Sequence, residues 1–199
     1  MYDKNVLHLN ITGEPGVGQT NVAHLLYEMF PYPQSIWIPR WTDRPRRPGE
    51  RADTQYLFFE SRFKLLQLAG EFLILDTIHE NMVRKTPRVY AIPRPLYWPS
   101  AVRETRFYLS NFGRYSGQVK ERFAPHMINI LLLASDVVRE TRLKRKSRKQ
   151  NLNLTEKILW DYWWDEKNFD LVVQNEGTVE ECAEKIIKLV GLDLIKRSP

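Results

Sequence analysis

Near the N-terminus a short run of apolar residues is followed by a glycine-rich loop. After the loop, apolar residues recur with the spacing of a helix. The run over 6–11 is continuous, as in a buried strand, whereas the apolar positions over 22–29 recur on one face of a helix. Between them lies the loop Thr12-Gly13-Glu14-Pro15-Gly16-Val17-Gly18-Gln19-Thr20. The pattern predicts a strand, a phosphate-binding loop and a helix in succession.

The rest of the chain alternates between short apolar runs and helical patterns. Further strands are predicted at 35–38, 56–59, 106–110, 127–134 and 169–175. Helices are predicted at 61–69, at 154–166 and after a capping box that begins at Thr178. The helix over 61–69 is expected to turn Phe63, Leu66 and Leu68 inward. Strands alternating with helices around a phosphate-binding loop favour one α/β domain with a mainly parallel sheet.

The loop is suited to anions because its backbone N–H groups converge at the positive end of a helix. Gly13, Gly16 and Gly18 allow the turn, and Thr20 follows them. The residue before Thr20 is Gln19, a neutral amide, where a lysine would reach the β- and γ-phosphates. Since charge stabilisation is most of phosphoryl-transfer catalysis, the loop argues more strongly for nucleotide binding than for catalysis. The alternative is a glycine-rich turn that binds nothing.

Composition narrows the class of protein. With 199 residues, 43% of them hydrophobic, the chain is long enough for one well-buried core. No apolar run approaches the roughly 20 residues of a membrane span, and the first residues do not form a signal peptide, so a cytoplasmic protein is expected. The single cysteine, Cys182, lies at an apolar helical position and is expected to pack. A net charge of +6 indicates an anionic ligand, which fits nucleotides, phosphoproteins, nucleic acid or acidic lipids alike.

A second candidate phosphate site lies in the stretch over 40–51, which two prolines and a glycine mark as a loop. This loop holds four arginines within eight positions, which are Arg40, Arg44, Arg46 and Arg47. Planar guanidinium groups on a proline-stiffened loop suit a bidentate grip on phosphate. The alternative is a solvated run of charge.

The order and spacing of these motifs resemble guanylate kinase. The similarity lies in the phosphate-binding loop, then Thr42-Asp43-Arg44-Pro45-Arg46-Arg47-Pro48-Gly49-Glu50, then Tyr56 before an aromatic strand, then Gly70-Glu71-Phe72-Leu73. It continues through Arg88-Val89-Tyr90 to a closing Phe169-Asp170-Leu171-Val172-Val173-Gln174-Asn175. The resemblance implies one guanylate-kinase-like domain over 1–199. That domain would comprise a core (4–34 and 95–190), a monophosphate-binding subdomain (35–94) and a lid near 139–154.

The resemblance also implies roles for individual residues. ATP phosphates would be cradled by Gly13, Gly16, Val17, Gly18, Gln19 and Thr20, and Thr20 would also bind Mg²⁺. The acceptor phosphate would be held by Arg44, Arg47, Tyr56 and Tyr90. The lid contains a stretch over 142–149 with six cations in eight residues. The catalytic residues would be Thr20, Arg142, Lys146 and Lys157. For the lid, a nucleic-acid patch and an inert solvated helix are the rival interpretations.

Three departures from the family pattern leave two functions open. Gln19 replaces the loop lysine, Ile74 stands where an acidic residue would read guanine, and Ser110-Asn111 replaces an aspartate-containing segment. The first function is phosphoryl transfer from ATP to a nucleoside monophosphate such as GMP, or to a similar small phosphorylated acceptor. The second is that of a catalytically inactive, pseudokinase-like domain that binds nucleotide or a phosphorylated protein partner. Binding of nucleic acid through the lid is a weaker third possibility.

Overall fold

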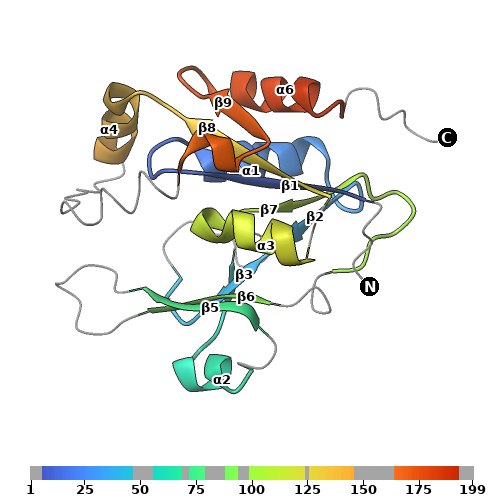
Figure 1. Cartoon of the computed structure of the whole chain (residues 1–199), viewed down its shortest axis with the longest axis vertical. Helices are drawn as coiled ribbons and strands as arrows, with labels where there is room; N and C mark the ends of the chain where they lie inside the picture. Colours follow the sequence, from blue (N-terminus) through green and yellow to red (C-terminus); the bar gives the residue numbers. More distant parts are fainter. Residues whose placement is uncertain are drawn as a thin grey trace.

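A computed structural model describes residues 6–46, 56–68, 72–78, 88–93, 99–123, 126–145 and 164–192. Its centre is a five-stranded sheet in the order β2-β7-β1-β8-β9, with every neighbouring pair parallel. The strands are β1 (Leu7–Gly13), β2 (Ser35–Ile38), β7 (Phe107–Ser110), β8 (Met127–Leu133) and β9 (Leu171–Gln174). The predicted α/β fold with a mainly parallel sheet is confirmed (Figure 1).

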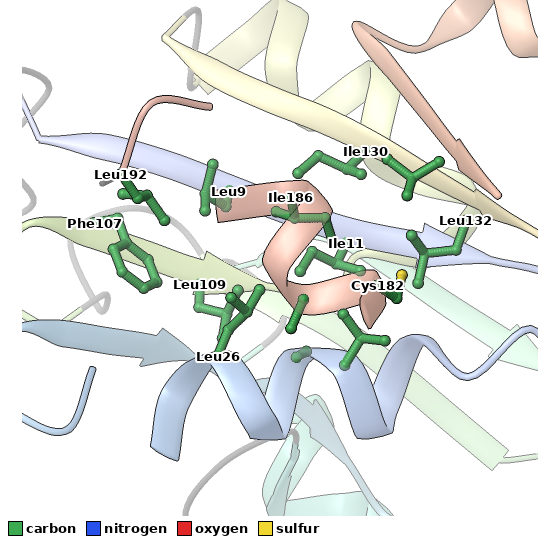
Figure 2. Close-up of a cluster of buried hydrophobic side chains, with 14 of the residues drawn as sticks. Leu9, Ile11, Leu26, Phe107, Leu109, Ile130, Leu132, Cys182, Ile186 and Leu192 are labelled. Carbon is green, nitrogen blue, oxygen red and sulfur yellow. The ribbon is translucent and has the colours of Figure 1, made fainter. Parts of the chain in front are cut away.

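Helices cover both faces of this sheet because the strands bury side chains on both sides. The helices α1 (Gln19–Met29) and α6 (Val179–Leu189) pack on one face with Leu9 and Ile11 of β1 (Figure 2). On the other face lie the 3₁₀ helix η3 (Gly113–Tyr115) and α3 (Ser116–Phe123). The alternation along β1 therefore assigns its odd-numbered residues to the α1 and α6 side and its even-numbered residues to the α3 side.

Two sequence predictions about α6 are confirmed. Thr178 and Glu181 form the expected capping box, in which each side chain accepts a hydrogen bond from the other residue's backbone N–H. Cys182 is only 1% exposed within the core of Figure 2, and burial raises the pKa of its thiol to about 11. Cys182 therefore packs as a small hydrophobic residue.

A smaller second sheet has the order β4-β3-β6-β5 and lies beyond β2 and β7 in Figure 1. Its strands are β3 (Arg40–Thr42), β4 (Tyr56–Phe58), β5 (Phe72–Ile78) and β6 (Arg88–Pro93). The prediction that residue 40 begins a loop was wrong, because Arg40, Trp41 and Thr42 pair with β4 and β6. Burial of Trp41 against Leu65 and Ala91 stabilises this strand.

The helix α2 (Arg62–Leu66) covers part of this second sheet, but with a different face from the one predicted. Phe63 is 71% exposed and Leu66 is 40% exposed, whereas Leu65 is fully buried. Leu68, which was also expected to turn inward, lies outside α2 and is exposed. In a helix of so few residues one side chain is enough to anchor the packing, and periodicity alone does not identify it.

Some predictions fall outside the described residues. The predicted helix at 154–166 lies mostly outside them, and so does the lid beyond residue 145. The helix α4 (Asp136–Arg145), which contains the first residues of the predicted lid, is described. None of the helices in the described ranges has the length and apolar character needed to cross a membrane.

Candidate functional site

The loop between β1 and α1 has the geometry of an anion cradle. Gly16 and Gly18 adopt positive φ angles of 91° and 93°, which residues with a Cβ rarely adopt. The N–H of Val17 closes a turn on Glu14 O at 3.2 Å. Gly18 is the N-cap of α1, and no side chain caps the helix or places a negative charge in its first turn. An anion at this helix terminus would meet backbone N–H donors and the positive end of the helix dipole.

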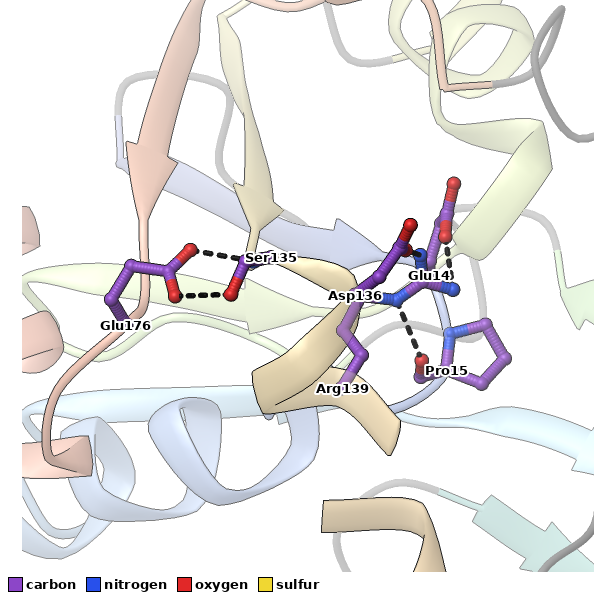
Figure 3. Close-up of polar contacts among 6 residues, drawn as sticks. All are labelled: Glu14, Pro15, Ser135, Asp136, Arg139 and Glu176. Atoms are coloured by element: carbon purple, nitrogen blue, oxygen red, sulfur yellow. Dashed lines mark hydrogen bonds and ion pairs between the residues drawn. The ribbon is translucent and has the colours of Figure 1, made fainter. Parts of the chain in front are cut away.

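The helix α4 packs directly on this loop through Arg139. Its guanidinium group forms ion pairs with Glu14 and Asp136, and its Nε donates to Pro15 O at 3.3 Å (Figure 3). Backbone contact is equally close, because a Cβ on Gly16 would lie 3.0 Å from Arg139 O. Arg139 therefore balances the negative charge of Glu14 inside the loop and holds α4 against it.

A second arginine of α4 fixes the other side of the loop. Arg142 donates to the carbonyl oxygens of Val17 at 3.2 Å, Asn175 at 2.9 Å and Gly177 at 3.0 Å. The Nδ2 group of Asn175 donates to the same Val17 oxygen at 2.7 Å. The loop, α4 and the turn after β9 are thus joined at the carbonyl of Val17. Asn175 ends the predicted strand over 169–175, but the sequence does not predict its contact with the loop.

The second candidate phosphate site lies at β3, the residues that follow it, and β4, where the structure brings Arg44 and Tyr56 together. Arg44 is only 4% exposed, and its guanidinium carbon lies 4.5 Å from the Tyr56 ring centroid and 5.0 Å from that of Phe58. Arg40 is one of the four loop arginines but not one of the acceptor residues that the resemblance implies, and it also contacts this tyrosine: Nη2 donates to Tyr56 Oη at 2.5 Å. Two guanidinium groups therefore surround one aromatic ring.

The other predicted acceptor residues are placed only in part. Tyr90 lies on β6 opposite Thr42 of β3, which puts it on the strand next to the arginines. Ile74 lies on β5, and the structure describes no side-chain contacts for either residue. Arg47 and the predicted catalytic lysines Lys146 and Lys157 lie outside the described residues.

A buried polar network occupies the α3 side of the central sheet. Asn10 accepts hydrogen bonds from Ser110 Oγ at 3.1 Å and Phe112 N at 2.8 Å, and donates to Ser116 at 2.7 Å and Asn129 at 3.0 Å. His8 Nε2 lies 2.8 Å from Ser110 Oγ and is the donor, since that hydroxyl already donates to Asn10.

This network fixes the turn that follows β7, where the family pattern has its aspartate. Ser110 is one of its members, and Asn111 accepts a hydrogen bond from Gly113 N at 3.2 Å. Burial lowers the pKa of His8 to about 3, so its imidazole is neutral. The described part of this segment thus contributes neutral groups to the end of β7 next to the phosphate-binding loop.

Comparison with known proteins relates this architecture to a solved enzyme structure. Guanylate kinase from Anaplasma phagocytophilum superposes with a TM-score of 0.66 and 20% identity, covering 96% of this chain and 87% of that chain. An uncharacterized protein from Eubacterium ventriosum ATCC 27560 matches with a TM-score of 0.45 and 15% identity, over 93% of this chain and 98% of that one. No protein-family model and no curated protein matches the sequence. At this identity the first match establishes a guanylate-kinase-like fold.

Proposed function

We propose that the protein transfers a phosphoryl group from ATP to a nucleoside monophosphate or a similar small phosphorylated acceptor. Arg44, almost fully buried on Tyr56 and Phe58, carries the proposal. Its guanidinium group donates to Pro45 O at 3.1 Å and is held with its planar face on the two rings, and the fork of donors of such a group matches the oxygens of phosphate. The likeness to a guanylate kinase fold supports the same assignment.

The loop before α1 would hold the donor phosphates. Its fit to them rests on Gly16 and Gly18, whose positive φ angles shape the cradle, and on the uncapped start of α1. Among the described residues, no three His, Cys, Asp or Glu side chains gather closely enough to hold a metal ion by themselves. Mg²⁺ would therefore arrive with the donor phosphates, whose charge it neutralises, and Thr20 in the first turn of α1 would be its protein ligand.

The protein's own residues would mainly position the two ligands. The phosphate-binding loop and the second sheet together would align the donor and acceptor phosphates, and such positioning contributes to phosphoryl transfer beside the stabilisation of charge. Gln19 would hydrogen-bond a phosphate oxygen without adding charge. Lys146 of the predicted lid and Lys157, which follows the lid, remain the proposed source of additional positive charge over the donor.

A second function, binding of a phosphorylated ligand without turnover, is favoured by two observations. Gln19 leaves the loop without its cation, and Arg142 has its guanidinium group engaged by three backbone carbonyls. Loss of one preorganised charged group typically costs about 3 kcal/mol of transition-state stabilisation. In this alternative the Arg44 site would hold a nucleotide or the phosphate of a protein partner.

Calorimetric titration separates the two functions. We would titrate the protein with GMP, with other nucleoside monophosphates and with ATP in the presence and absence of Mg²⁺. Arg44→Ala should abolish acceptor binding, whereas Arg103→Ala, at an exposed position before β7, should leave it unchanged. Binding of both ligands followed by ADP formation supports the kinase. Acceptor binding without ATP binding supports the binding module, and no binding of any phosphate ligand contradicts both.

A further inference from the structure

Arg40 lies at the junction of the two sheets. It follows the carboxyl end of β2 by two positions and begins β3, where the chain passes from one sheet to the other. Its guanidinium carbon lies 4.8 Å from the Tyr56 ring centroid. It also approaches the turn after β7, because a Cβ on Gly113 would lie 3.4 Å from Arg40 Nη1. Arg40 thus lies beside the carboxyl edge of a parallel sheet, where ligands of such folds bind.

The N–H donors of the Arg40 side chain have few hydrogen-bond partners for a group that is partly buried. Its Nε is buried without a hydrogen-bond partner, and within the described ranges its guanidinium group contacts no carboxylate. Its one side-chain hydrogen bond there goes to the neutral Tyr56 hydroxyl. Buried donors on charged groups are normally bonded, because removing them from water is costly. An unmatched buried donor on a cation therefore indicates an anionic ligand.

Arg40 and Arg44 also place two positive charges around one ring. Their guanidinium carbons lie 4.8 and 4.5 Å from the Tyr56 centroid. The two charges are therefore separated by less than about one Debye length, which is roughly 10 Å. At such a separation they repel each other unless an anion lies nearby. A monophosphate offers a single anionic group, for which Arg44 and the predicted Arg47 already suffice. The positive charge of Arg40 comes in addition to these two. It therefore matches a ligand that carries more negative charge than a monophosphate.

We propose that Arg40 binds a second anionic group of the acceptor. The acceptor would then be a small molecule that carries a phosphoryl group and another phosphoryl or carboxylate group, in place of a simple monophosphate. This inference rests on the proposed function, because it assumes that the first phosphoryl group lies at Arg44 and Tyr56. It assigns Arg40 to substrate specificity.

Matched ligand pairs test the inference by calorimetry. One pair is guanosine 5′-monophosphate with guanosine 3′,5′-bisphosphate, and a pair without a base is fructose 6-phosphate with fructose 1,6-bisphosphate. In at least one pair the bisphosphate should bind about tenfold more tightly to the unmodified protein. Arg40→Gln, which removes the charge, should abolish this preference while retaining monophosphate binding. Arg40→Lys should keep most of the preference.

The control variant is Tyr56→Phe, which removes the hydroxyl partner of Arg40 but keeps the ring. It should weaken both members of each pair to the same degree, because Tyr56 belongs to the first phosphoryl site, and it should retain the preference for the bisphosphate, because the charge of Arg40 remains. Equal affinity for both members of each pair in the unmodified protein would overturn the inference and leave the proposed function standing. Equal weakening of both members by Arg40→Gln would show that Arg40 only supports Tyr56. Failure of every ligand to bind would remove the proposed function as well.

Discussion

His8 is a fully buried histidine whose environment excludes the charged form. Burial lowers its pKa from 6.5 to about 3, so the folded protein holds the imidazole neutral while the unfolded chain takes up a proton below pH 6.5. Its Nε2 is already committed to Ser110, at the end of the polar network below the phosphate-binding loop. Since Nε2 already carries the proton donated to Ser110, a second proton would place a desolvated positive charge beside the network that fixes the turn after β7.

We predict that acidification destabilises the fold through His8. The folded pKa lies below the unfolded one, so this contribution is complete above pH 6.5 and is lost as the pH falls toward 3. The expected slope is about 1.4 kcal/mol per pH unit within that window. Urea unfolding between about pH 7.5 and pH 5 measures this slope. These pH values lie above the range in which most carboxylates titrate, so the carboxylates contribute little to it. His8→Gln should flatten the slope, and an unchanged slope would show that other groups cause it.

For Arg142, the resemblance implies contact with phosphate, whereas the structure shows three bonds to backbone carbonyls. We predict that Arg142→Ala lowers the free energy of unfolding by about 2 kcal/mol, because charge-assisted hydrogen bonds are lost and carbonyls are left without donors. Lys144→Ala, whose side chain is exposed and pairs only with Glu140 in the described structure, should change it by less than about 0.5 kcal/mol. Unchanged stability in Arg142→Ala, with only its turnover reduced, would restore the catalytic role.

At the scale of elements, the phosphate-binding loop is held in place by backbone approach as much as by side chains. Gly18 has a φ of 93°, and a Cβ there would lie 2.8 Å from Asn175 Nδ2. The same amide anchors the loop through the carbonyl of Val17. A side chain at residue 18 would therefore have two effects. It would displace the Asn175 amide, and it would strain the left-handed backbone of the loop.

We predict that Gly18→Ala lowers stability by at least about 1 kcal/mol and weakens ATP binding, because the left-handed backbone disfavours a Cβ. The matched variant is Gly117→Ala in α3, where an added Cβ meets no atom within 4 Å. This second change should be neutral or stabilising by up to about 1 kcal/mol. Thermal unfolding and ATP titration of both variants measure the difference. Equal behaviour would mean that the geometry at residue 18 is not required.

The elements also show which features the sequence could predict. β1, β2, β8 and α1 were predictable because continuous apolar runs and helical spacing are local signals. β3 was not, because its pairing with β4 and β6 depends on residues far along the chain. The sequence placed Arg40 among four arginines on an expected loop, but its contact with Tyr56 was not predictable, because that contact depends on the pairing of β3 with β4. Arg44 and Tyr56 were found through the family pattern, whereas the contact of Asn175 with Val17 depends on long-range packing.

At the scale of the whole molecule, the two candidate phosphate sites lie on different sheets of one fold. The donor loop leaves β1 of the five-stranded sheet, and Arg44 follows β3 of the four-stranded sheet. The connection from β2 to β3 is the single residue Pro39, and Arg40 begins β3 directly after it. Phosphoryl transfer would require the donor loop and the Arg44 site to hold their ligands at the same time. A binding module would require only the Arg44 site.

Gln19→Lys distinguishes these cases because it restores charge to the loop without touching the acceptor site. If both sites are intact, we predict that the variant forms ADP about 10²-fold faster than the unmodified protein with the same acceptor, because one preorganised charge contributes on this scale. Gln19→Met, which has a similar length and no charge, is the control and should give no gain. Acceptor affinity should be the same in all three proteins. Tighter ATP binding without faster ADP formation would contradict the kinase and favour the binding module, since the restored charge would then stabilise bound donor and transition state equally.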